Sequence, residues 1–337
     1  MHFSSILSVT LGLSLSALAH PTQKLSTRAT GRTSPPSGCL TVGGSSGKYS
    51  TISSALEALG SSTEDACIFV YSGTYKEQFT VEYGGALTLY GYTEDASSYA
   101  SNAVTITNTI SSSDAGSLDK SSTVNVVADG FKMYNINVEN GYGEGSQAVA
   151  LTANADKLSF YGCSFTSYQD TLYAKAGTQY YAKSYITGAV DYIFGDASLW
   201  ITSSTIASNG AGAITAMSRE ESDDASYYVI DSSTVTAADA ATAADAATAD
   251  LTGKVYLGRP WRAYARVQFQ NSELSDVINE EGWTTMAENA EPVYTEFNNS
   301  GDGADTSKRV YGTEATSAVE IATVLGSDYA DWVDASY

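Results

Sequence analysis

Six segments of the chain repeat one arrangement of apolar and small residues. Each segment has three fixed positions. An apolar residue comes first, a middle residue follows after two free positions, and a second apolar residue follows after one more free position. The middle residue is small in all copies but the first. The six triplets are Met133/Ile136/Val138, Phe160/Cys163/Phe165, Tyr181/Ser184/Ile186, Ile201/Ser204/Ile206, Ile230/Ser233/Val235 and Phe269/Ser272/Leu274. Their last residues step by 27, 21, 20, 29 and 39 positions along the chain.

A period near 20 residues without intervening helices predicts a solenoid of β coils, in which the longer steps carry insertions at one turn. Apolar runs at 68–71, 87–90 and 104–106 predict further strands before the first triplet, because Gly, Ser and Asn clusters separate them. The expected fold is therefore all-β, with short flanking helices.

Two short helices are predicted beside the strands. Apolar residues in the range 51–59 recur at helical spacing, and Ser50 or Thr51 can cap the helix. We expect this helix to cover the open end of the stack. Within 316–332, Val319, Ala322, Thr323 and Leu325-Gly326 predict a second short helix and its stop.

A β-sandwich is the competing interpretation. It is supported by Asn-Gly pairs at 140–141 and 209–210, which are typical of hairpin turns. The solenoid is favoured because Asp170 and Asp191 repeat in register with the apolar pattern. Each aspartate lies five residues after the last apolar residue of its triplet, so the two are offset by 21 residues.

This offset would place the two carboxylates one above the other, roughly 5 Å apart, if the coils stack as a parallel sheet. Like charges that close cannot both ionise freely, so one pKa should rise. Such a pair suits acid/base chemistry and nucleophilic attack. The alternative is that Asp170 and Asp191 are solvated turn residues, as aspartates after strands commonly are.

The chain divides into a leader, an arm and one domain. Residues 1–19 resemble a secretory signal peptide, with an apolar run and a small-x-small cleavage site, although the first residues lack Lys and Arg. A transmembrane anchor, the alternative, needs a longer apolar run. Residues 20–38 are predicted to form a flexible arm. Residues 39–337 form a single catalytic β-helix domain, within which 236–250 is a low-complexity insertion.

Charge and histidine content exclude several kinds of chemistry. The 337 residues include 17 basic and 38 acidic side chains, a net charge of −21, which argues against nucleic acids and anionic membranes as partners. The two histidines, His2 and His20, lie in or beside the leader. Neither a Ser-His-Asp mechanism nor a zinc site is therefore expected, and we predict no metal and no cofactor.

Cysteines and one sequon fit a secreted chain. Cys39 and Cys67 flank one short segment and are predicted to form a disulfide, which leaves Cys163 as a buried free thiol. Asn298 begins the sequon Asn-Asn-Ser and is a candidate glycosylation site.

Five motifs in order resemble those of pectin methylesterases, in particular the secreted fungal members. They are Gly-Thr-Tyr-Lys-Glu at 73–77, Gln-Ala-Val-Ala-Leu at 147–151, Tyr-Gln-Asp-Thr-Leu at 168–172, Gly-Ala-Val-Asp-Tyr-Ile-Phe-Gly at 188–195 and Leu-Gly-Arg-Pro-Trp at 257–261. The resemblance covers roughly residues 40–335. It departs from the common pattern at Tyr192, where many members have Phe, and in the 236–250 insertion.

The resemblance implies a right-handed parallel β-helix that hydrolyses the C6 methyl esters of galacturonosyl residues in pectin. It implies Asp191 as nucleophile, Asp170 as general acid and base, Gln169 and Gln147 as oxyanion donors, and Arg259 as the partner of Asp191. Tyr173, Val190, Phe194 and Trp261 resemble the residues that line the sugar groove. Pectin is then the expected partner of a secreted, extracellular monomer.

Other functions remain open from the sequence. A glycoside hydrolase also uses two carboxylates about 5 Å apart. A calcium-dependent lyase would need an oxygen-rich metal site. A carbohydrate-binding solenoid without activity would keep its binding after loss of Asp191.

Overall fold

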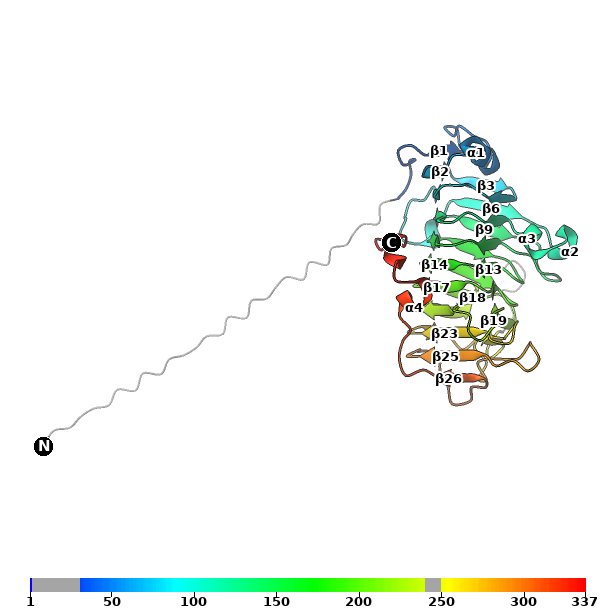
Figure 1. Ribbon diagram of the computed structural model, residues 1–337, viewed down its shortest axis with the longest axis vertical. Helices are drawn as coiled ribbons and strands as arrows, with labels where there is room; N and C mark the ends of the chain where they lie inside the picture. Colours follow the sequence, from blue (N-terminus) through cyan, green and yellow to red (C-terminus); the bar gives the residue numbers. More distant parts are fainter. Residues whose placement is uncertain (2–30, 240–249) are drawn as a thin grey trace.

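The computed structural model describes residue 1 and residues 31–239 and 250–337. Within these residues, three parallel sheets run along one coiled stack (Figure 1). The predicted signal peptide after residue 1, most of the predicted arm, and residues 240–249 of the predicted insertion lie outside the described residues. No helix of the described part is long and apolar enough to cross a membrane.

Each coil in the middle of the stack contributes a strand to each sheet in turn, while coils at the two ends contribute to only some of the sheets. The first sheet contains β1 (Leu40–Val42), β2 (Ala66–Val70), β5 (Leu87–Gly91), β8 (Lys132–Tyr134), β11 (Leu158–Tyr161), β14 (Thr178–Ala182), β17 (Ser198–Thr202), β20 (Tyr228–Asp231), β23 (Arg266–Gln270), β25 (Val293–Phe297) and β26 (Gly312–Glu314). The second contains β4 (Phe79–Val81), β7 (Val124–Val126), β10 (Leu151–Asn154), β13 (Leu172–Ala176), β16 (Ile193–Gly195), β19 (Gly212–Met217) and β22 (Val255–Gly258). The third contains β3 (Gly73–Lys76), β6 (Val104–Asn108), β9 (Asn137–Asn140), β12 (Ser164–Thr166), β15 (Tyr185–Gly188), β18 (Thr205–Ser208), β21 (Thr234–Ala237) and β24 (Glu273–Leu274).

The register between coils follows the repeat seen in the sequence. Phe165 pairs with Ile186, and Ile186 pairs with Ile206, in parallel strands of the third sheet. In the first sheet Phe160 pairs with Tyr181 in the same way. All five residues are buried, so equivalent apolar residues stack on one another inside the coils. The parallel β-helix is confirmed, and the β-sandwich interpretation is wrong.

The small position of the last five triplets builds a ladder of hydrogen bonds between coils. The main-chain N–H of Cys163 donates to the hydroxyl of Ser184 at 3.1 Å, and the N–H of Ser184 donates to Ser204 at 3.0 Å. The ladder continues from Ser204 to Ser233 and from Ser233 to Ser272. A small hydroxyl side chain is required here because it must satisfy a buried main-chain donor of the coil before it.

Helix α1 (Ile52–Leu59) confirms the first predicted helix. The Thr51 hydroxyl accepts a hydrogen bond from the N–H of Ser54, which is the N-cap arrangement. Ile52 and Ala55 are buried against the first coil, and Figure 1 shows the helix at the end of the stack. The apolar face of α1 therefore closes the core at that end.

Helix α4 (Ile321–Leu325) confirms the second predicted short helix and its stop at Leu325-Gly326. The helix ends at Gly326, whose φ of 85° breaks the helical path, and a 3-10 turn, η2 (Tyr329–Asp331), follows. Buried Val324 and Leu325 pack with Trp200 of the first sheet. Tertiary packing over that sheet, rather than helical propensity, holds this segment.

Three other short helices were not predicted. They are η1 (Tyr99–Ser101), α2 (Ser112–Ala115) and α3 (Leu118–Ser121). Each is about one turn long and is preceded by a serine N-cap, and Ser111 and Ser117 cap α2 and α3 by accepting N–H bonds from Asp114 and Lys120. A single turn has no apolar period to detect, which explains why the pattern missed them.

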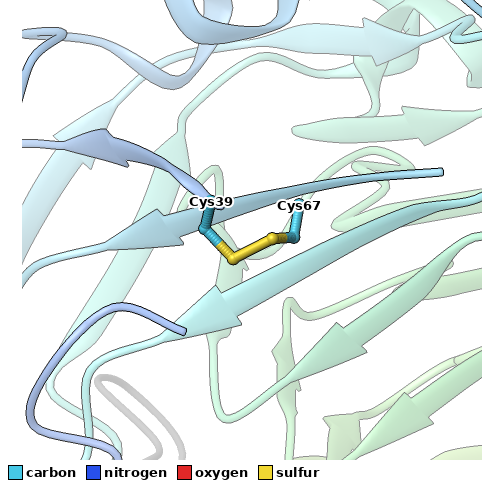
Figure 2. Close-up of a disulfide and its surroundings, with 2 residues drawn as sticks. All are labelled: Cys39 and Cys67. Carbon is cyan, nitrogen blue, oxygen red and sulfur yellow. A yellow bond between two sulfur atoms is a disulfide. The ribbon is translucent and has the colours of Figure 1, made fainter. Parts of the chain in front are cut away.

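Figure 2 shows the disulfide between Cys39 and Cys67, which confirms the predicted pair. It links the segment before β1 to β2, which are neighbours in the first sheet. Cys163 is free and fully buried, as predicted, and burial raises its pKa to about 12. It is therefore a protonated, unreactive thiol at neutral pH.

The described end of the predicted arm contacts the first sheet. The Arg32 guanidinium donates to Asn135 Oδ1 at 3.1 Å and lies 4.9 Å from the ring centre of Tyr90 and 5.3 Å from that of Tyr134. Cation–π and hydrogen-bond contacts together hold this residue against the outer face of the sheet.

We expect the serine ladder to contribute measurably to stability. In a Ser184→Ala variant the buried N–H of Cys163 loses its acceptor, which should lower the free energy of unfolding by about 1–3 kcal/mol. The melting temperature should fall by several degrees relative to the parent. Ser61→Ala, at an exposed turn position, is the control and should melt like the parent. Equal melting of both variants would contradict a stabilising role for the ladder.

Candidate active site

Asp170 and Asp191 lie at equivalent points of successive coils, where the third sheet turns into the second. The N–H of Asp170 donates to Val190 O at 3.0 Å, and the N–H of Asp191 donates to Ala213 O at 2.7 Å. Their φ angles are +63° and +51°, a left-handed conformation that aspartate tolerates better than most residues. The bridge between Gln169 and Val190 fixes the same register. The predicted stacking of the two aspartates is therefore present.

Arg259 reaches Asp191 from a later coil. It follows β22, and its N–H donates to Thr215 O at 2.9 Å, while Pro260 favours an extended backbone at Arg259. Its Nε donates to Asp191 Oδ1 at 2.8 Å and its Nη2 to Oδ2 at 2.7 Å. This bidentate pair holds Asp191 as an oriented carboxylate.

Asp170 is in a different electrostatic state. It is 7% exposed, and burial raises its pKa to about 8. The neighbouring charge of Asp191 makes a smaller contribution to the same rise in pKa, while Arg259 opposes it. At neutral pH the site therefore holds one ionised carboxylate and one carboxylic acid that can donate a proton.

A small open cavity collects most of the predicted site residues. Asp170, Asp191, Gln147, Gln169, Arg259, Phe194 and Trp261 line it. Two predicted residues, Tyr173 and Val190, are not among those that line the cavity. Tyr173 stacks on Phe194, with ring centres 4.4 Å apart and planes 9° apart, and continues its surface along the second sheet. Val190 pairs with Gln169 but is not among the residues that line the cavity.

Aromatic rings form one wall of the site. Phe194 lies between Tyr173 and Trp261, whose ring centre is 5.9 Å from that of Phe194. Rings arranged in this way offer flat apolar area at low conformational cost, beside polar groups that can fix orientation. The wall and the acidic pair therefore face one binding space.

Sequence reasoning missed three residues that line the cavity, namely Leu118, Ala216 and Met286. Leu118 begins α3, and the exposed Met286 lies in a segment without regular structure, so neither belongs to a periodic pattern. Ala216 could have been found, because in β19 it pairs with Phe194. Each adds apolar surface around the carboxylates.

The chemistry available at the site comes from two carboxyl groups, one guanidinium and two amides. Within residues 31–239 and 250–337, no group of three or more His, Cys, Asp or Glu side chains is arranged to hold a metal ion. A carboxylate oriented beside a carboxylic acid provides a nucleophile and a proton donor. The amides of Gln147 and Gln169 provide neutral hydrogen-bond donors at the same cavity.

The raised pKa of Asp170 predicts a pH dependence of stability. Above about pH 4 the unfolded chain loses this proton, while the folded protein keeps it up to about pH 8. Across this window the contribution of Asp170 to the free energy of unfolding should therefore fall, by at most about 1.4 kcal/mol per pH unit. Asp170→Asn removes the penalty, so its melting temperature should exceed that of the parent by a margin that grows from pH 4 to pH 8.

Thermal melts of the parent and the variant at matched ionic strength measure this margin. Asp302→Asn, at an exposed loop position, is the control and should show no such trend. A margin that does not change with pH would contradict the raised pKa.

Comparison with known proteins agrees with this arrangement. The Pectinesterase family model matches residues 40–326. "Probable pectinesterase A" of Aspergillus niger is 61% identical over 337 residues, 100% of both chains, and "Pectinesterase A" of Emericella nidulans is 61% identical over 92% of this chain and 93% of its own. The solved pectin methylesterase of Aspergillus niger in deglycosylated form superposes with a TM-score of 0.88 at 64% identity, covering 91% of this chain and 100% of that chain. The solved pectin methylesterase from carrot superposes with a TM-score of 0.77 at 28% identity, covering 89% of this chain and 96% of that chain. The chain therefore belongs to the pectinesterase family of enzymes.

Proposed function

We propose that this enzyme is secreted and removes C6 methyl esters from the galacturonosyl residues of pectin through a covalent intermediate on Asp191. The products are methanol and pectate. The observation that carries the proposal is the bidentate Arg259–Asp191 pair beside Asp170, whose pKa is raised to about 8. Membership of the pectinesterase family supports the reaction class, and the site supplies its mechanism.

In the first step Asp191 attacks the ester carbonyl carbon with one carboxylate oxygen. Negative charge moves to the carbonyl oxygen, where the amide groups of Gln147 and Gln169 can donate hydrogen bonds. Such donors are each worth about 3–4 kcal/mol at the transition state. As the C–O bond to the methoxy group breaks, Asp170 gives its proton to the leaving oxygen. Methanol departs and an acyl-enzyme anhydride remains.

In the second step Asp170, now a carboxylate, takes a proton from water. The hydroxyl adds to the sugar-derived carbonyl carbon, and the bond to Asp191 breaks. Asp191 returns as a carboxylate paired with Arg259, and Asp170 is again protonated. One water and one ester have become one carboxylic acid and one methanol, with no other reactant needed.

The surroundings of the site suit a polysaccharide. Trp261 and Tyr173 are partly exposed and offer ring faces for stacking against sugar rings, while the buried Phe194 packs between them and supports both. Val190 lies beside Gln169 at the turn and is proposed to support the groove from there. Asn298 is exposed at a turn with φ of +50°, where a glycan would project into solvent, so we propose it as the glycosylated residue of a secreted monomer.

Three product assays test the reaction. With methylated pectin the purified protein should release methanol, while polymer viscosity and ultraviolet absorbance stay constant. Asp191→Asn should abolish methanol release and keep the parental fold. Falling viscosity with new reducing ends would instead indicate a glycoside hydrolase, and an absorbing unsaturated product would indicate a lyase. Pectin binding without any product would indicate a binding solenoid.

The Asp170→Asn and Asp191→Asn variants should lose different steps of the reaction with a small activated ester. A nitrophenyl ester needs no proton on its leaving group, so Asp170→Asn should still release a burst of nitrophenol. Sustained turnover should be absent, because no base remains to activate water. Asp191→Asn should give no burst, since the nucleophile is missing.

Rapid mixing with absorbance detection measures the burst, with Asp302→Asn as the control that should turn over like the parent. A burst in Asp191→Asn alone would reverse the two roles. Equal recovery in both variants would mean that an activated water attacks the ester directly.

A further inference from the structure

Gln147 is clamped by a residue that the reaction itself does not use. Ser112 is the first residue of α2, and its N–H donates to Gln147 O at 2.8 Å. Its hydroxyl donates to Gln147 Oε1 at 3.0 Å. Among the described residues, no other hydrogen bond is made to the side-chain amide of Gln147. The segment that the sequence did not predict as helical therefore holds one of the two proposed oxyanion donors.

This clamp matters because Gln147 lacks other restraint. The residue is exposed, in contrast to Ala148, Val149 and Ala150, which follow it and are buried. A glutamine has three rotatable side-chain bonds, and ordering it costs conformational free energy that must be met before it can stabilise a transition state. A donor that is already fixed meets that cost when the protein folds rather than during the reaction.

The charge of Asp191 determines which end of the Gln147 amide should enter the cavity. A serine hydroxyl can donate or accept, so the contact alone permits both orientations. The cavity contains the carboxylate of Asp191, and an inward carbonyl oxygen would face that negative charge. The orientation with Oε1 on Ser112 directs the NH2 group of Gln147 toward the cavity, where an oxyanion would form.

We propose that Ser112 is a positioning residue that orients the Gln147 amide for the oxyanion, an inference that rests on the proposed esterase mechanism. Ser112 does not touch the ester; it acts through Gln147. The oxyanion exists only along the reaction path, so loss of the clamp should lower kcat and leave KM nearly unchanged. The same short segment brings Leu118 to the cavity, so 111–121 shapes the site in two ways.

The direct test is Ser112→Ala, with methanol release from methylated pectin as the assay. We expect kcat to fall by about threefold to tenfold, the range for one lost hydrogen bond, with KM changed by less than about twofold. Ser112→Thr keeps the hydroxyl and should recover most of the rate. Ser113→Ala is the matched control, because the Ser113 hydroxyl contacts Ser111 and Ser146 and not Gln147.

A double-mutant cycle separates positioning from a structural effect. In the Gln147→Ala background, Ser112→Ala should cause no further loss, because there is no amide left to orient. Equal losses in both backgrounds, or an unchanged kcat in Ser112→Ala alone, would overturn the inference. If Gln147→Ala itself releases methanol at the parental rate, the oxyanion role of Gln147 fails, and the role of Ser112 fails with it. Absence of methanol release by the parent would instead refute the proposed esterase.

Discussion

Parallel main-chain hydrogen bonding between successive coils is the constraint on which this structure depends. Because the coils stack in register, each residue lies over its equivalent in the next coil. Phe160 and Tyr181 become stacked rings 4.6 Å apart, and serines become a ladder of buried hydrogen bonds. The same rule places Asp170 beside Asp191. A stack that stabilises apolar and hydroxyl pairs thus forces two carboxyl groups together.

The carboxyl pair is accommodated by two different means. Arg259 follows β22, two strands beyond β16 in the second sheet, and forms a bidentate ion pair with Asp191. Among the described residues Asp170 forms no ion pair, and it instead keeps its proton, since burial raises its pKa to about 8. Loss of the ion pair with Arg259, or of the proton on Asp170, would leave a buried, uncompensated charge, which is strongly unfavourable. The proposed division into a nucleophile and an acid therefore follows from how the fold tolerates the pair.

Much of the architecture could be predicted from the sequence because a solenoid repeats local information. The triplets gave the strands and their register, and the offset of 21 residues gave the aspartate pair. The cavity wall was harder to predict, because Leu118 and Met286 come from irregular segments between strands. The second short helix within 316–332 and its end at Gly326 could also be predicted, because apolar spacing and a terminal glycine are local signals. Ser112 was invisible to pattern reasoning because a contact across 35 residues depends on the path of a loop.

The backbone at the two proposed catalytic positions also limits which substitutions can test the site. Asp170 and Asp191 both have positive φ, a conformation that costs an ordinary residue about 1–2 kcal/mol and that aspartate and asparagine adopt more readily. Substitution by alanine would therefore combine the loss of a carboxylate with backbone strain at the turn. Asparagine keeps the size and the left-handed preference of aspartate. The turn geometry narrows each position to a few residue types, and of these aspartate alone provides a carboxyl group. Structural and chemical requirements thus select the same residue at each position.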